Sequence, residues 1–369
     1  MTDGRKSRRG KSRRRQPTIA DVARVANVSV STVSRVVRDH ADVGSDTREK
    51  VLEVIEQLSY RPSPIARALV RGWSQTVALL MSDIANPFYP ELAKHVEQEA
   101  GKHGYSVVIC NTDDDPRESK RIVQRLLNQG IEGFIHASVG SDESGVLSVL
   151  GGTNSIVFTN RRPRSTDCNY VVSDNRKAAV LLTTHLLDRG YRRIGFIAGP
   201  EYATNATERL EGFQATMDEH PDTSALVVEG DFGPESGAQA VGSWLRLRTR
   251  PTAIIGINDS VALGAIGRLL AAGYSVPGDV AVAGFDDIAL ASSPIVGLTT
   301  VAQHIEGLAQ RSVRLLLRRL EHGSGGKPIH DVLEPTLIVR RTTTPPNRDR
   351  PTKAGAVGDV PRRRESARR

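Results

Sequence analysis

Residues 18–37, TIADVARVANVSVSTVSRVV, show two short helical patterns separated by a tight turn. Thr18 can cap the first helix, because Asp21 follows three residues later and completes a capping box. Apolar side chains then recur at helical spacing at Ile19, Val22, Ala23 and Ala26. Asn27 suits a left-handed turn position, which ends the first helix.

The second helix begins after Ser29, which is a good N-cap residue. Its apolar side carries Val33, Val36 and Val37. Two short helices joined by a turn of three to four residues form a helix-turn-helix unit. The outward side presents side chains that suit base edges and phosphates, namely Val30, Ser31, Ser34 and Arg35.

A third helix is predicted from Gly44 or Ser45 to Leu58, with a core built from Val51, Leu52, Ile55 and Leu58. These patterns define a head at residues 17–62. The spacing alone also permits a three-helix bundle without any DNA role.

The stretch YRPSPIARALVRG follows the head and predicts a short hinge helix at residues 63–72. Ser63 is placed to cap it, and Pro64 suits the first helical position. A helix of about eight residues is marginal in water. We therefore expect it to form only when something packs on it.

The stretch 18–37, together with TREKVLEVIEQLSYRPSPIARAL at residues 47–69, closely resembles the head and hinge of the lactose-repressor/galactose-repressor family. The resemblance implies that the second helix enters the major groove of an operator. It implies that hinge helices of two subunits pair in the minor groove, where Leu69 wedges into a base step. Ser63 and Pro64 depart from the family, which often has Asn at the first of these positions. The expected DNA contacts are Thr18, Ser29, Val30, Ser31, Thr32, Ser34, Arg35, Ala66 and Leu69.

After the head the chain alternates strand-like and helical stretches. One series of apolar runs comprises TVALLMSDI, YSVVICNT, GFIHASV and SIVFTN, and a second comprises RRIGFIAG, ALVVEGD, TAIIGIND and VAVAGFDD. Buried parallel strands read as such runs, and βαβα alternation predicts doubly wound sheets. The fold class is therefore α/β, with two lobes and a cleft between them.

Polar and aromatic residues collect just after these strands, where α/β sheets bind ligands. Carboxylates and amides bind sugar hydroxyls, while an aromatic face covers the apolar side of a ring. Asp83 follows the first strand in this way. The expected effector contacts are Phe88, Tyr89, Asn160, Arg161, Asn205, Arg209, Phe232, Asn258, Asp259 and Asp286. Any one of these residues, taken alone, could equally well be a helix cap or a turn residue instead of an effector contact.

The family resemblance continues to about Pro345 and implies that Arg209 of RLEGF and Asp286 of GFDD contact the effector. It implies an aromatic stacking role for Phe232. His136 replaces a more usual aliphatic residue, and we expect it to be structural. The body implied at 73–345 resembles periplasmic sugar-binding proteins, has three crossovers between lobes and dimerises through its N-lobe. Its N-lobe is expected at about 75–161 and 303–333, and its C-lobe at about 162–302 and 334–345.

Composition and charge limit the class of protein. The chain has 369 residues, so it should hold more than one core. No apolar run reaches the ~20 residues of a membrane helix. Two cysteines are too few for a disulfide framework. We expect a cytoplasmic protein.

The net charge of +8 is concentrated at the two ends of the chain. Residues 1–17 carry 8 − 1 = +7 and residues 347–369 carry 8 − 3 = +5, which leaves −4 for the rest. The stretches 1–16 and 346–369 are predicted to be basic disordered tails. They either contact polyanions without sequence preference or serve only solubility.

No nucleotide-binding loop, zinc motif or nucleophile elbow is present, so we expect neither an enzyme nor a cofactor or metal. The prediction is a repressor that binds a palindromic operator as a homodimer and responds to a small, sugar-like effector. Two alternatives remain: a DNA-binding regulator without a ligand, and a sugar-binding protein, which leaves the head unexplained. The coupling free energy between effector binding in the cleft and folding of the hinge is expected to be ~1–3 kcal/mol.

Overall fold

The computed structural model describes residues 17–37, 42–60, 74–138, 140, 143–151, 155–323 and 326–344. They belong to two compact units that divide after Gln75. The hinge at 63–72, with Ala66 and Leu69, lies outside the described residues, and so do the tails at 1–16 and 346–369. Among the described helices, none is long and apolar enough to cross a bilayer.

The head consists of three helices, α1 (Ile19–Ala26), α2 (Val30–Val37) and α3 (Ser45–Gln57). The predicted capping box at the start of α1 is present, since Thr18 N donates to Asp21 Oδ2 at 2.9 Å and Asp21 N donates to Thr18 Oγ1 at 3.3 Å. Asn27 ends α1 with a left-handed φ of 52°. The two capping residues that the sequence predicts therefore lie at the two ends of α1.

The core of the head differs from the expectation at one residue. Val51 and Val54 of α3 are buried, whereas Leu52 is 51% exposed and the prediction that it closes the core was wrong. Residues three apart share a helix face, so a stripe through Val51 and Val54 turns Leu52 toward solvent. The core packs α3 against α1 and α2 through Val22, Ala23, Ala26, Val33 and Val36.

The first lobe of the body is built on a sheet with the strand order β11-β5-β4-β3-β1-β2. Its strands are β1 (Thr76–Met81), β2 (Ser106–Asn111), β3 (Gly133–His136), β4 (Ile156–Thr159), β5 (Tyr170–Ser173) and β11 (His330–Leu333). Its helices are α5 (Phe88–Lys102), α6 (Pro116–Asn128), α7 (Ser144–Leu150) and α12 (Ile305–His322). All pairings in this sheet are parallel.

Side chains of β1 alternate between the two faces of this sheet, as the two-residue period of a strand requires. Val77, Leu79 and Met81 pack in one apolar cluster, whereas Ala78 and Leu80 pack in a second cluster with residues of α6 and α7. Helices therefore cover both faces, which is the doubly wound arrangement that the apolar runs predicted.

The second lobe is built on a sheet with the order β12-β10-β9-β8-β6-β7. Its strands are β6 (Arg193–Ala198), β7 (Ser224–Glu229), β8 (Ala253–Gly256), β9 (Ala281–Asp286), β10 (Thr299–Ala302) and β12 (Thr336–Ile338). Only β12 is antiparallel. Its helices are α8 (Asn175–Asp188), α9 (Thr204–Asp218), α10 (Pro234–Trp244) and α11 (Asp259–Ala271), with short 3₁₀ turns η1 (Ala289–Ser292) and η2 (Arg341–Thr343).

One expected lobe boundary is wrong. The C-lobe is expected at about residues 162–302, but β5 lies within that range and pairs with β4 and β11 of the first sheet. A loop rather than a helix joins β4 to β5, so the βα alternation gave no sign of this strand. The chain therefore leaves the first lobe after Ser173 rather than after Arg161.

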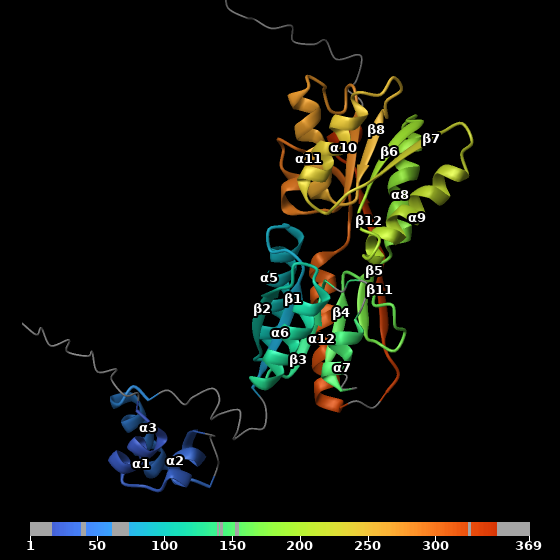
Figure 1. The fold of residues 1–369 in the computed structure, drawn as a ribbon. Helices are drawn as coiled ribbons and strands as arrows, with labels where there is room; N and C mark the ends of the chain where they lie inside the picture. Colours follow the sequence, from blue (N-terminus) through green and yellow to red (C-terminus); the bar gives the residue numbers. More distant parts are fainter. Residues whose placement is uncertain are drawn as a thin grey trace, which may run out of the picture. The chain divides into compact units, whose positions relative to one another are not determined.

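The chain crosses between the lobes three times, after β5, after β10 and after β11. Figure 1 shows the result, because the orange helix α12 from late in the sequence lies among the blue and green elements of the first lobe. It packs against α5 and against β3, β4 and β5. The crossings hold the carboxyl ends of the parallel strands of both sheets near one another, where a cleft can form.

Candidate functional site

Helix α2 presents its predicted DNA-reading side to solvent. Val33 and Val36 are buried, and Val30, Ser31 and Arg35 on the other side are exposed. Ser29 caps the helix, because Thr32 N donates to Ser29 Oγ at 3.0 Å. Thr18 and Ser29 are exposed, and Thr32 and Ser34 are half-buried. This side of the head thus presents the methyl groups of Val30, several hydroxyls and the guanidinium of Arg35.

A small polar chamber lies between the two lobes. It is lined by Asn86, Phe88, Tyr89, Asn160, Arg161, Asn205, Arg209, Phe232, Asn258 and Asp286. Nine of the ten predicted effector residues are in this set. They come from both lobes and lie at the ends of strands or the starts of helices, where parallel sheets place their ligand contacts.

Arg209 is a buried arginine that the second lobe contributes to the chamber. Its Nε donates to Asn175 Oδ1 at 3.0 Å, its Nη1 donates to the Ile257 carbonyl at 2.6 Å, and its Nη2 contacts Asp286 Oδ1 at 3.2 Å. The guanidinium carbon also lies 4.7 Å from the Phe285 ring centroid. Burial lowers the pKa of Arg209, and the Asp286 carboxylate opposes this. These contacts hold the guanidinium in one orientation.

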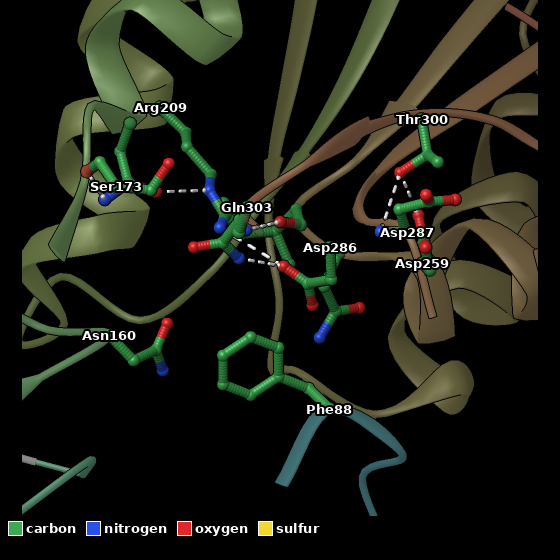
Figure 2. A network of polar contacts seen from close by, with 12 residues as sticks. Phe88, Asn160, Ser173, Arg209, Asp259, Asp286, Asp287, Thr300 and Gln303 are labelled. Atoms are coloured by element: carbon green, nitrogen blue, oxygen red, sulfur yellow. Dashed lines mark hydrogen bonds and ion pairs between the residues drawn. The ribbon is translucent and has the colours of Figure 1, made fainter. Parts of the chain in front are cut away.

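Asp286 ends strand β9 in an uncommon backbone conformation. Its φ is 113°, a region that side-chain-bearing residues rarely adopt and that is often found at binding sites. Burial raises the pKa of Asp286 to about 6, and Arg209 and a hydrogen bond from Gln303 Nε2 oppose the rise. Figure 2 shows Arg209 and Gln303 converging on this carboxylate, with Phe88 nearby. Arg209 and Gln303 therefore fix the orientation of the Asp286 carboxylate, which is a hydrogen-bond acceptor.

Arg161 is the buried arginine that the first lobe contributes to the chamber, as Arg209 is for the second lobe. Its Nη1 contacts Asp114 Oδ1 at 2.6 Å, and its guanidinium carbon lies 4.8 Å from the ring centroid of Phe232 in the second lobe. Tyr202 of the second lobe donates to Asp114 Oδ2 at 3.3 Å. These contacts link the lobes across the cleft.

Three buried polar atoms at the chamber have no partner in the described part of the chain: Arg161 Nε, Asn205 Oδ1 and Gln303 Oε1. Buried polar atoms are almost always hydrogen-bonded, so these atoms point to a ligand or ordered water. The chamber has a volume of only about 10 Å³, which is room for about one water molecule. An outer compartment of about 560 Å³ shares Asn86 and Phe232 with it and is also lined by Asp83.

Asp259 is the one predicted effector residue that does not line the chamber. Its carboxylate accepts from Thr300 Oγ1 at 2.6 Å and from Ile288 N at 3.0 Å. Burial, with the nearby Asp286 carboxylate, raises its pKa well above the usual range. Figure 2 shows Asp259 and Thr300 on the far side of Asp286 from Arg209. Its contacts are those of a structural residue.

Two further strand-end residues have partly structural contacts. Asn258 lines the chamber and also caps α11, because Val261 N donates to its Oδ1 at 2.8 Å. His136 does not line the chamber: it is buried in the first lobe, accepts from Ser138 N at 3.3 Å and contacts the ring of Phe158. Burial, with a contribution from Arg161, lowers its pKa to about 3, so it is neutral.

Four residues at the chamber were missed by the sequence reasoning: Asn86, Asp114, Tyr202 and Gln303. Gln303 follows β10 directly, so the strand-end rule would have found it had that four-residue strand been recognised. Asp114 and Tyr202 lie in the loops after β2 and β6, so the strand-end rule covers their loops but does not single out these positions. In the part of the chain that is described, no cluster of His, Cys, Asp and Glu suits a metal ion.

A helix-turn-helix head followed by two doubly wound lobes with a buried polar chamber defines a ligand-responsive DNA-binding protein. Residues 18–63 match the family model of bacterial regulatory proteins of the lacI family, and residues 183–343 match that of a periplasmic binding protein-like domain. The chain belongs to the lacI family and is a transcriptional regulator with a helix-turn-helix DNA-binding domain.

Relatives and solved structures of this family are similar over nearly their whole length. The ribose operon repressor of Halalkalibacterium halodurans is 37% identical over 333 residues, which cover 88% of this chain and 97% of the relative. The transcriptional repressor PurR of Mannheimia succiniciproducens is 31% identical and covers 88% and 98%. A lac repressor dimer bound to operator superposes with a TM-score of 0.79 at 29% identity, covering 89% and 99%. The CelR–cellobiose complex gives 0.67 at 30%, covering 88% and 99%.

Proposed function

We propose that this regulator is a repressor that binds a palindromic operator as a homodimer, and that a small polyhydroxylated effector sets its affinity. The observation that carries the proposal is the chamber, where Arg209 and Asp286 contact each other while Arg161 Nε and Asn205 Oδ1 have no partner among the described residues. A ring bearing several hydroxyls can satisfy such atoms, and Phe88 and Phe232 offer it apolar faces. Because the chamber has a volume of only about 10 Å³, the proposal requires the lobes to move apart to admit the effector.

The similar structures support a sugar-like effector. One was solved with cellobiose and another, from Enterococcus faecium, with ribose. We propose the nine chamber residues Phe88, Tyr89, Asn160, Arg161, Asn205, Arg209, Phe232, Asn258 and Asp286 as effector contacts. We propose Val30, Ser31 and Arg35 as base readers, with Thr18, Ser29, Thr32 and Ser34 beside them. Ala66 and Leu69 remain the proposed minor-groove contacts.

The domain organisation is proposed with one amendment. The head comprises residues 17–62, the hinge 63–72 and the body 73–345, with the first crossover placed after Ser173 because β5 belongs to the first sheet. A protein that acts on chromosomal DNA works in the cytoplasm, and we propose that location. Neither catalysis nor a cofactor forms part of the proposed mechanism.

The DNA half of the proposal is tested by selecting bound fragments from a pool of random duplexes. A dimer with two identical heads should return an inverted repeat, because operator symmetry mirrors protein symmetry. A selected site without two-fold symmetry, or no enrichment at all, would contradict the proposal.

The effector half is tested by thermal unfolding of the full chain with ribose, cellobiose and a panel of related sugars. A ligand that binds only the folded state raises the melting temperature by mass action. Asp286→Ala should abolish that shift while operator binding persists. A retained shift would remove Asp286 from the site, whereas no shift with any sugar would favour a regulator without a small ligand.

A further inference from the structure

The outer compartment of the cleft adjoins the chamber and has room for a ligand unit of its own. Its volume of about 560 Å³ lies within the range of about 300–1,000 Å³ that small-molecule sites occupy. Asn86 and Phe232 line both spaces, so the chamber and the outer compartment meet at these two residues. A ligand that is held in the chamber can therefore extend into the outer compartment.

Both lobes build the outer compartment from residues that follow parallel strands or begin helices. The first lobe contributes Ser82 and Asp83 after β1 and Asp113 after β2. The second lobe contributes residues 231–235 after β7 and Ser260 at the start of α11. Parallel sheets bind ligands at these ends. A ligand in the outer compartment would also contact both lobes, and a ligand must do so if its binding is to depend on how the lobes are arranged.

The lining of the outer compartment combines an aromatic ring with hydrogen-bond acceptors. Phe232 offers the ring, and Ala85 and Pro234 add apolar surface. Five carboxylates supply the acceptors. Asp114 is paired with Arg161, whereas the other four form no ion pair with any residue that the structure describes: Asp83, Asp113, Asp231 and Glu235. Sugar hydroxyls can donate to such carboxylates while the apolar side of the sugar ring packs on the aromatic face.

The outer compartment is negatively charged even when the nearby helix starts are counted. Helices α5, α10 and α11 begin at or beside its lining residues. Each helix N-terminus carries roughly half a positive charge, so the three together offset only about 1.5 of the four unpaired carboxylate charges. No Lys or Arg is among the described lining residues. A phosphate or carboxylate group on a ligand would therefore meet charge of its own sign, and an uncharged ligand would not.

Arg161 lies where the chamber and the outer compartment meet, and it has an unused donor. Its guanidinium bonds Asp114 of the outer compartment and lies over the Phe232 ring that both spaces share. The Arg161 side chain is 1% exposed, and its Nε has no partner among the described residues.

Asn205 Oδ1 in the chamber is a buried acceptor without a described partner, so the cleft requires both a donor and an acceptor from a ligand. A hydroxyl group supplies both, whereas an ammonium group only donates and an ionised carboxylate only accepts. These two buried atoms therefore favour a ligand rich in hydroxyls over a cationic or an anionic one.

We propose that the outer compartment is a second sugar subsite, and that the effector is an uncharged saccharide of two or more rings. One ring occupies the chamber and the next occupies the outer compartment, with Phe232 at the boundary and with Asp231 and Glu235 accepting from hydroxyls of the second ring. This inference rests on the proposed function, because it assigns a ligand class to the same cleft. Sugar phosphates and sugar acids bind weakly, because the unpaired carboxylates repel them.

Titration calorimetry of the full chain tests the second subsite with cellobiose, lactose, maltose and sucrose against glucose, galactose and fructose. The disaccharide that binds most tightly should bind at least about tenfold more tightly than either of its units, because the second ring adds contacts to a ligand that is already held. Equal affinities for the two sizes would overturn the second subsite and leave the proposed function standing. Binding of no sugar of either size would overturn both.

A substitution that fills the outer compartment locates the second ring. Ala85 is exposed and lines this compartment but not the chamber, so Ala85→Trp should remove most of the preference for the disaccharide over its units. The matched control is Ala215→Trp, at an exposed position on α9 outside both spaces, and it should keep the preference. A preference that survives Ala85→Trp in a folded protein would overturn the proposal.

A charge substitution gives a second readout. The double variant Asp231→Asn, Glu235→Gln should weaken binding of the preferred disaccharide and should reduce the gap, at least about tenfold in the wild type, between that disaccharide and its 6-phosphate. Glu201→Gln, Glu229→Gln is the matched control, because it removes the same charge from exposed positions of the same lobe outside the compartment. Equal behaviour of the two double variants, or a phosphate that binds as tightly as the uncharged sugar in the wild type, would overturn the proposal.

Discussion

The phenol of Tyr202 donates a hydrogen bond to Asp114 Oδ2 at 3.3 Å, and this bond joins the two lobes of the body. Asp114 also pairs with Arg161, whose guanidinium covers Phe232 of the second lobe. A carboxylate, a phenol and a guanidinium therefore keep the cleft closed by direct contacts within the protein itself.

Tyr202→Phe should shift the ligand-free body toward an open cleft. A hydrogen bond to a charged group contributes about 1.5–3 kcal/mol, so the closed population should fall on the order of tenfold relative to the open one. Distances between spin labels on exposed positions, one in each lobe, would report the shift. Tyr274→Phe is the control, because Tyr274 bonds Arg250 within the second lobe. Identical distance distributions for the wild type and Tyr202→Phe would contradict this role.

Arg35→Ala should weaken binding to the operator but not to a random duplex. Arg35 lies on the exposed side of α2, and a side chain that reads a base contributes about 1–3 kcal/mol of discrimination. Lys50 on α3 is also exposed, and Lys50→Ala should change binding to both duplexes equally or not at all. Fluorescence anisotropy at one fixed salt concentration measures both. Equal losses on both duplexes for Arg35→Ala would make Arg35 a phosphate contact only.

His136 should destabilise the protein in acid. Its pKa is lowered from 6.5 to about 3 in the folded state, so the unfolded chain binds the proton more tightly. The contribution of neutral His136 to the free energy of unfolding is fully present above about pH 6.5 and is lost as the pH falls toward 3. Near pH 4 the loss is about 3 kcal/mol. His136→Leu should flatten the pH dependence of the denaturant midpoint between pH 7 and pH 4, and exposed His322→Gln should not. A steep wild-type slope that survives His136→Leu would contradict the assignment.

Asp259→Ala should reduce stability because it leaves two buried donors, Ile288 N and Thr300 Oγ1, without their acceptor. Each unsatisfied buried group costs about 1–3 kcal/mol, so the loss should be about 2–6 kcal/mol. Urea unfolding measures it. The exposed Asp279→Ala variant removes an acceptor whose donors, among the described residues, are the amide and hydroxyl of Ser275, and it should cost much less. Similar losses for the two variants would show that Asp259 is not a structural acceptor.

The sequence predicted most of the chamber because one physical rule covers it. Polar residues that directly follow buried parallel strands meet at one edge of the sheet, and Asn160, Asn258 and Asp286 obey this rule. The capping residues Thr18, Asn27 and Ser29 likewise predicted where the first two helices begin or end. These signals are local, so a single sequence carries them.

What the sequence did not predict depends on contacts between distant segments. Strand β5 has four residues and no helix before it, so its lobe is revealed by its pairings, with β4 just before it and with β11 more than 150 residues later. Asp114 and Tyr202 are 88 residues apart and interact only because the lobes meet. Asp259 follows β8 as a ligand residue would, but the Thr300 hydroxyl reaches it from β10. Such pairings have no periodic signature.

The three crossings between the lobes also determine the order in which the chain can fold during synthesis. The head is complete once residue 60 has emerged, but the first lobe lacks α12 and β11 until residues 305–333 follow. Until then the faces of β3, β4 and β5 that α12 covers stay exposed. Domains fold as units while the ribosome delivers ~5–20 residues per second, so the interval between the end of β5 at Ser173 and the end of β11 at Leu333 lasts roughly 8–30 s. A nascent chain therefore has a finished DNA-binding head well before it has a finished sensor.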